Sequence, residues 1–140
     1  MVKILIVDDE EINRIMLREI LSESGYRDFI EAGNGREAVE VARQHRPDIV
    51  LLDVIMPGMS GIEAAPQIKA SSPDCYLPIL FITSLDDEQS LVKCLESGGD
   101  DFISKPFEKI ILHAKVKAHE RTRRLSLEIQ DKNQSLTYFQ

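Results

Sequence analysis

Short apolar runs alternate with amphipathic segments along this chain of 140 residues. Apolar runs bounded by turn-forming or acidic residues predict strands, and apolar positions that recur every three or four residues predict helices. The expected strands are residues 3–7, 28–32, 49–53, 78–83 and 101–104. The expected helices are residues 11–24, 34–42, 61 to about 71, 86 to about 97, and 107 to about 136. Strands and helices therefore alternate throughout.

The central predicted strand is a continuous apolar run, Ile49-Val50-Leu51-Leu52, that leads into Asp53. Such a run is typical of a strand buried on both faces of a parallel sheet. The pattern contains no hairpin signal, so it predicts an α/β fold with a doubly wound, five-stranded parallel sheet. Pro66 falls inside the third predicted helix and lacks a backbone donor. We therefore expect a kink or a late helix start there.

Polar residues mark the ends of the predicted strands. The first strand ends in Asp8-Asp9, the third in Asp53, the fourth in Thr83-Ser84 and the fifth in Ser104-Lys105. Right-handed crossovers bring the carboxyl ends of parallel strands to one edge of the sheet, where α/β proteins bind ligands. Three carboxylates, a hydroxyl and an ammonium are therefore expected in one cleft.

Clustered carboxylates repel one another unless a cation compensates them, and an all-oxygen ligand set suits Mg²⁺. Mg²⁺ is often bound together with phosphate oxygens, so a phosphoryl group fits the same cleft. Lys105 offers a positive charge and Thr83 a hydroxyl for that group, and Asp53 is a candidate nucleophile that would form an aspartyl-phosphate. No glycine-rich loop opens the first helix, so phosphate binding of the P-loop kind is not expected.

These residues occur in one order with a short set of turn residues: Asp8-Asp9, Asp53, Met56-Pro57-Gly58, Gly61, Thr83 and Lys105-Pro106. The set resembles the receiver domain of two-component response regulators, over about residues 2–120. The resemblance implies a flavodoxin-like sheet with strand order 2-1-3-4-5. It also implies that Asp53 is the phosphoacceptor.

The resemblance further implies the metal ligands. Asp9 and Asp53 would bind Mg²⁺ directly together with the backbone carbonyl of Ile55, and Asp8 would act mainly through water.

For the phosphoryl group, the resemblance implies contacts from Thr83, Ser84 and Lys105. Thr83 and Phe102 would form the switch pair, and the bond between Lys105 and Pro106 would be cis. Phosphorylation would repack the helix that begins at Asp86, the last strand and the last helix.

On this interpretation the protein is a signalling switch rather than an enzyme that acts on other substrates. A sensor histidine kinase or a phosphotransfer protein would donate the phosphoryl group to Asp53. The alternative is a phosphohydrolase or phosphotransferase that uses an aspartyl-phosphate on external substrates. Haloacid-dehalogenase-type phosphatases place a second Asp two residues after the nucleophile, and that place is occupied by Ile55.

The last predicted helix is far longer than the average of about 12 residues. We expect a receiver domain over residues 1–120 and a helical linker or coiled-coil extension over 121–140, toward a possible missing output domain. The heptad positions are Ile111, Ala118, Leu125 and Lys132 with Lys115, Thr122, Ile129 and Leu136. They predict a homodimer through this helix, with a solvated tail as the alternative. We interpret Lys115, Lys117, Arg121, Arg123 and Arg124 as a solvated face.

Composition narrows the class of protein. No apolar run reaches the roughly 20 residues that span a bilayer, and the N-terminus lacks the features of a signal peptide, so we expect no membrane association and a cytoplasmic location. The net charge of -7 argues against direct nucleic-acid binding. Neither the cysteines, Cys75 and Cys94, nor the histidines, His45, His113 and His119, show metal-ligand spacing.

Overall fold

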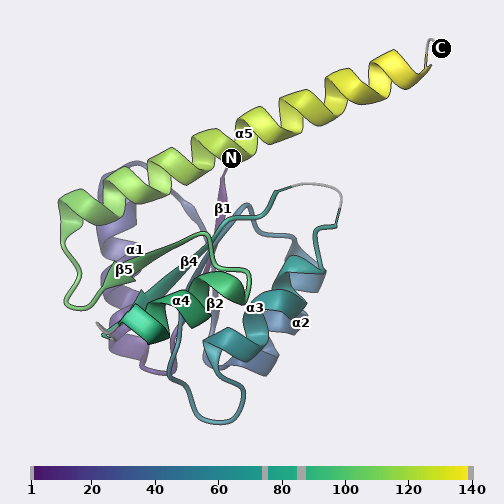
Figure 1. The fold of residues 1–140 in the computed structure, drawn as a ribbon. Coiled ribbons are helices and arrows are strands. Elements are labelled where there is room, and N and C mark those ends of the chain that lie inside the picture. Colours follow the sequence, from purple (N-terminus) through teal and green to yellow (C-terminus); the bar gives the residue numbers. More distant parts are fainter. Residues whose placement is uncertain (1, 74–75, 85–87, 139–140) are drawn as a thin grey trace.

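The computed structural model describes residues 2–73, 76–84 and 88–138 (Figure 1). Five parallel strands form one sheet in the order β2-β1-β3-β4-β5. They are β1 (Lys3–Val7), β2 (Asp28–Ala32), β3 (Ile49–Asp53), β4 (Ile79–Thr83) and β5 (Asp101–Ser104). The predicted fold class and strand order are confirmed.

Helices cover both faces of the sheet. They are α1 (Glu11–Glu23), α2 (Gly35–His45), α3 (Gly61–Lys69), α4 (Glu88–Glu96) and α5 (Lys109–Tyr138). Buried residues of α2, α3 and α4 pack on one face, and those of α1 and α5 pack on the other. The result is a three-layer sandwich, with α5 running past the edge of the domain (Figure 1).

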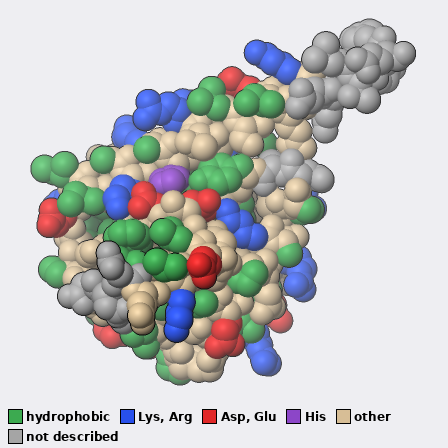
Figure 2. Space-filling view, in the orientation of Figure 1, with side chains coloured by type: hydrophobic (Ala, Val, Ile, Leu, Met, Phe, Trp, Pro, Cys, Tyr) green, Lys and Arg blue, Asp and Glu red, His purple; other side chains and the backbone are tan. Residues whose placement is uncertain are grey.

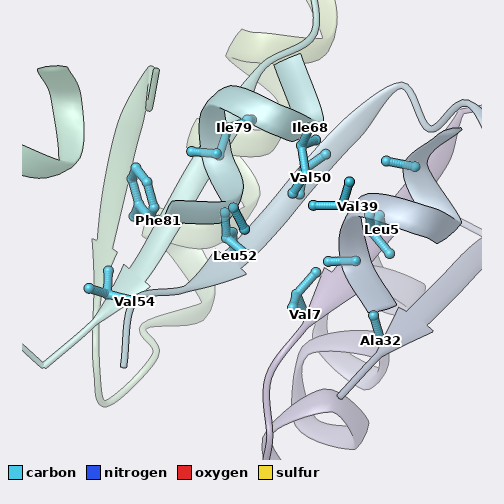
Figure 3. Close-up of a cluster of buried hydrophobic side chains, with 14 of the residues drawn as sticks. Leu5, Val7, Ala32, Val39, Val50, Leu52, Val54, Ile68, Ile79 and Phe81 are labelled. Carbon is cyan, nitrogen blue, oxygen red and sulfur yellow. The ribbon is translucent and has the colours of Figure 1, made fainter. Parts of the chain in front are cut away.

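Side chains of alternate residues in the central strands contribute to two different core clusters, one on each face of the sheet. On β3, Val50 and Leu52 face the cluster beneath α2 and α3, whereas Ile49 and Leu51 face the cluster beneath α1 and α5. Figure 3 shows the first of these clusters, where Phe81 lies near Val54 and Leu52. Because both of their faces are buried, the central strands β1, β3 and β4 are apolar at successive positions and become polar only at their ends.

The helix α3 begins at Gly61, so the expected late start is wrong. Ser60 caps the helix, its hydroxyl oxygen accepting from the backbone N–H of Glu63 at 3.2 Å. The N–H of Gly61 donates to the carbonyl of Val54 at 2.8 Å, and a Cβ at Gly61 would collide with the carbonyl of Asp53. Glycine therefore lets α3 start directly against the end of β3, and the helix continues through Pro66.

The starts of the fourth and fifth predicted helices have different outcomes. The predicted start of the fourth helix, Asp86, lies outside the described residues, and α4 is described from Glu88. The long helix α5 begins at Lys109 rather than Phe107. Its first turn is closed by Glu108, whose carbonyl accepts from the N–H of Leu112 at 3.0 Å.

The extended C-terminal helix is confirmed, but the interpretation of its basic residues as a solvated face is wrong for two of them. Lys115 Nζ lies 3.1 Å from Asp101 Oδ1, and Arg123 Nε lies 3.0 Å from Asp48 Oδ1. Both side chains therefore contact the domain beneath α5. Figure 2 shows charged and histidine side chains between the long helix and the rest of the domain.

The remaining basic residues named above, Lys117, Arg121 and Arg124, are exposed. Within the described ranges, none of the helices combines the length and the apolar character that crossing a bilayer requires.

Candidate functional site

The strand ends gather at one edge of the sheet, as the topology requires. Because Val7 pairs with Leu52 across β1 and β3, the residues that follow them, Asp8 and Asp53, lie side by side. Both carboxylates are buried: Asp8 is 1% exposed and Asp53 is 5% exposed. Asp9 is exposed at the rim.

These three acids form a cluster. One carboxylate oxygen from each of Asp8, Asp9 and Asp53 lies within 4.8 Å of the others. Across the part of the chain that the structure describes, no other group of three or more possible metal-ligating side chains meets this condition. The ammonium of Lys105, which follows β5, lies 3.3 Å from Asp8 Oδ2 and 3.4 Å from Asp53 Oδ1.

Local hydrogen bonds fix the orientation of Asp8. Its Oδ1 accepts from the backbone N–H of Glu10 at 2.9 Å, which leaves Oδ2 directed at Lys105. Arg14 on α1 donates from Nη1 to the backbone carbonyl of Asp8 at 2.6 Å and from Nε to Glu31 Oε1 at 3.1 Å. The carboxylate is therefore positioned before any cation binds. Sequence reasoning missed Arg14, which the pattern shows only as a polar residue in the first turns of a helix.

The electrostatics of the site favour an added positive charge. The pKa of Asp53 is raised to about 6, mainly by burial and also by the neighbouring charges of Asp8 and Asp9, against the opposing effect of Lys105. Burial lowers the pKa of Lys105, but the charges of Asp53 and Asp8 outweigh it and the net pKa is raised. One ammonium thus faces three carboxylates, and the ionised form of Asp53 is less stable in the folded protein than in water.

This donor set fits Mg²⁺. It consists of oxygen atoms only, it carries excess negative charge, and one of its carboxylates lies at an open rim where bound water can remain. Ile55 follows Asp53 by two residues, and its backbone carbonyl is the further candidate ligand. Its side chain is 64% exposed.

The other predicted site residues lie on β4 and β5. Thr83 ends β4, is buried, and pairs in register with Ser104, the residue before Lys105. Ser84 is exposed. Phe102 lies on β5 opposite Phe81, is half-buried, and packs against the core cluster beneath α2 and α3. The peptide bond between Lys105 and Pro106 is cis, the geometry that the resemblance implied.

The comparisons with known proteins define the class to which this site belongs. Residues 4–117 match the family model of the response regulator receiver domain. The chain is 41% identical over 107 residues to the chemotaxis protein CheY of Halobacterium salinarum, a match that covers 76% of this chain and 87% of that protein. It is 33% identical to the crystal structure of a two-component response regulator from Clostridium difficile, which covers 86% of this chain and 97% of that one with a TM-score of 0.79.

The chain therefore belongs to the receiver domains of two-component response regulators. Some relatives are longer. The chain is 42% identical over 113 residues to a cyclic di-GMP phosphodiesterase of Thermotoga maritima, a match that covers 81% of this chain and 29% of that protein. It spans 55% of the transcriptional regulatory protein YvrH of Bacillus subtilis, with 37% identity over 135 residues.

The raised pKa of Asp53 predicts how the free energy of unfolding depends on pH. In a buffer with EDTA at pH 7, we expect Asp53→Asn to raise the free energy of unfolding by about 1–3 kcal/mol, because it removes a buried charge that the folded state disfavours. The folded pKa lies above the unfolded one, so wild-type stability should fall as the pH rises from about 4 to about 6. The gap between the two proteins should therefore narrow as the pH is lowered.

Urea denaturation at several pH values measures this difference. Asp28→Asn, at the opposite edge of the sheet, is the matched control and should change little. Added Mg²⁺ should stabilise the wild type more than Asp53→Asn. If Asp53→Asn is no more stable than the wild type at pH 7, the electrostatic account of the site is wrong.

Proposed function

We propose that this domain accepts a phosphoryl group on Asp53 from a sensor histidine kinase or a phosphotransfer protein, and that phosphorylation switches an output. One observation carries the proposal: a buried carboxylate at the end of the central strand lies beside a second buried acid, Asp8, and the ammonium of Lys105 lies within 3.4 Å of both. The family to which the chain belongs supports the same assignment.

In the reaction, a carboxylate oxygen of Asp53 attacks the phosphorus of the donor. The bond between phosphorus and the donor nitrogen breaks, its electron pair stays on the imidazole, and an aspartyl-phosphate forms. Mg²⁺ would be held by Asp8, Asp9, Asp53 and the carbonyl of Ile55. It would neutralise charge on the phosphoryl oxygens and keep Asp53 ionised.

Two sets of groups would then hold the phosphoryl oxygens. Lys105 is already directed toward Asp53 and supplies a positive charge. Thr83 and Ser84 supply hydroxyls from the end of β4. These roles follow from the position of each residue at the same strand edge.

A direct test is incubation with Mg²⁺ and acetyl phosphate followed by intact mass measurement. We expect one phosphoryl group per chain in the wild type and none in Asp53→Asn, whereas Asp28→Asn should behave as the wild type. Omission of Mg²⁺ should abolish labelling. Repeated turnover of an external phosphomonoester would instead support the alternative, a phosphohydrolase or phosphotransferase, and would contradict the switch.

The surroundings of Asp53 bear on how long the phosphoryl group persists. Hydrolysis requires a water molecule aligned with the phosphorus, and a polar side chain beside the attack path can orient it. Ile55, two residues after Asp53, is apolar and exposed and offers no such group. In the receiver family a second residue beside this path lies two positions after the switch threonine. Here it is Leu85, which lies outside the described residues.

We therefore expect slow loss of the phosphoryl group in the wild type and about tenfold faster loss in Ile55→Asn, a change of ~1.4 kcal/mol in the barrier. Decay of radiolabelled protein after removal of the donor measures both rates. Ile129→Asn, which replaces an exposed isoleucine of α5, is the control and should leave the rate unchanged. Equal rates for Ile55→Asn and the wild type would show that Ile55 does not protect the phosphoryl group.

A surface beside the site suits a protein donor. Helix α1 begins directly after the acidic residues and exposes Ile12, Ile15 and Met16. Apolar side chains clustered on one exposed helix face often mark a protein contact. We propose this face as the docking surface of the phosphodonor. A donor of this kind acts in the cytoplasm, which is the location we propose for this domain.

The signal would travel through α4, β5 and α5. Thr83 would move toward the phosphoryl group, and Phe102 would fill the space that this movement leaves. The repacked surface and the C-terminal helix would then control an output domain or a partner. Two relatives are longer than the part this chain matches, which leaves room for an output domain, and residues 121–140 would be the linker to it.

The C-terminal helix divides into a docked part and an exposed part. Polar contacts with the domain continue as far as Arg123, three residues beyond the expected boundary at 120. Lys115, one of the heptad positions, is bound to Asp101 and does not face outward. Leu125 and Ile129 are 51% and 59% exposed, so we propose a homodimer seam that begins beyond the docked part. The side chain of Leu136 lies outside those described.

This seam predicts the oligomeric state. We expect Leu125→Glu combined with Ile129→Glu to convert a dimer to a monomer, because both charges would be buried between the two helices. Sedimentation velocity over a range of protein concentrations, with and without phosphorylation, measures the change. Leu127→Glu, on another face of the helix, is the matched control. A wild type that is monomeric under every condition would rule out the seam.

A further inference from the structure

The short strand β5 connects the proposed phosphorylation site to the long C-terminal helix. At its carboxyl end, Ser104 leads into Lys105, whose ammonium lies between Asp8 and Asp53. At its amino end, Asp101 and Phe102 are bound by side chains of α5. Any displacement of β5 must therefore change contacts at both ends.

One side chain of α5 makes three of these contacts. The ammonium of Lys115 donates to the backbone carbonyl of Phe102 at 2.6 Å and to Asp101 Oδ1 at 3.1 Å. It also lies 4.9 Å from the centroid of the Phe102 ring, within the range of a cation–π interaction. The side chain is 31% exposed, so water screens these contacts only in part.

We propose that Lys115 couples the position of the Phe102 ring to α5, and that its contact with the ring favours the unphosphorylated state. This inference rests on the proposed function, in which Phe102 leaves its present position when Asp53 is phosphorylated. A ring that moves toward Thr83 loses the ammonium of Lys115, and α5 loses one of its attachments to β5.

The attachment of α5 to the domain does not depend on Lys115 alone. His119 Nε2 lies 3.1 Å from Asp101 Oδ2, and Arg123 is held by Asp48. Leu112 and Val116 are completely buried beneath the helix. Removing the charge of Lys115 should therefore leave α5 docked and change mainly the balance between the two ring positions.

Linkage gives the direction of the effect. If Lys115 stabilises the unphosphorylated arrangement, its loss must favour binding of a phosphoryl group, because both events act on the same two-state equilibrium. A cation–π contact of this exposure corresponds to a change of about two- to fivefold in that equilibrium.

The experiment measures the affinity of the full chain for beryllofluoride, an analogue of the phosphoryl group, in the presence of Mg²⁺. We expect two- to fivefold tighter binding for Lys115→Met, which keeps most of the apolar stem and removes the charge. Lys115→Arg keeps the charge and should remain within about twofold of the wild type. Phe102→Leu removes the ring, and in that background Lys115→Met should change the affinity less than it does in the wild type.

The outcomes separate this inference from the proposed function. Failure of the wild type to bind beryllofluoride, or equal binding by Asp53→Asn, would contradict the proposed function itself. If the wild type binds but Lys115→Met binds no more tightly, or changes the affinity equally with and without the Phe102 ring, only the inference is wrong. Circular dichroism of each variant shows that it is folded before the affinities are compared.

Discussion

The pair of buried carboxylates at the ends of β1 and β3 is the constraint on which the rest of the site depends. The register of the two strands fixes their separation, since Val7 is paired with Leu52. Burial and mutual repulsion make ionisation of Asp53 unfavourable, and Lys105 offsets this only in part. A site with this excess of negative charge requires a further cation. Its electrostatic potential changes strongly when a phosphoryl group is added.

The position of each strand in the sheet separates the rigid part of the site from the adjustable part. The central strands β1 and β3 are each paired on both sides, and their side chains are almost completely buried. They hold Asp8 and Asp53 in fixed positions. The edge strand β5 is paired on one side only, with β4; it carries Phe102 and leads directly into Lys105. A strand with fewer backbone hydrogen bonds is the part of the sheet best able to shift.

The helix α5 combines two surfaces that serve different purposes. Its inner side supplies buried apolar residues and a set of polar contacts with the amino-terminal edge of the sheet: Tyr26 donates to Glu120 Oε2 at 2.6 Å, and Arg123 donates to the carbonyl of Tyr76 at 2.7 Å. Its outer side exposes apolar residues beyond that edge. The inner contacts fix the direction in which the helix leaves the domain, and so they determine where the outer surface is presented (Figure 1).

By itself the pattern of residues determined the elements and the residues at the strand ends, because buried parallel strands are apolar until they terminate and right-handed crossovers bring those termini together. The strand order was expected from the resemblance to the receiver family rather than from the pattern. Only the tertiary structure decided what the charges of α5 do. Lys115 and Arg123 have the pattern of a solvated face, yet their partners Asp101 and Asp48 lie 14 and 75 residues away along the chain. No local pattern encodes such pairings, since they arise only where the helix crosses the packed sheet.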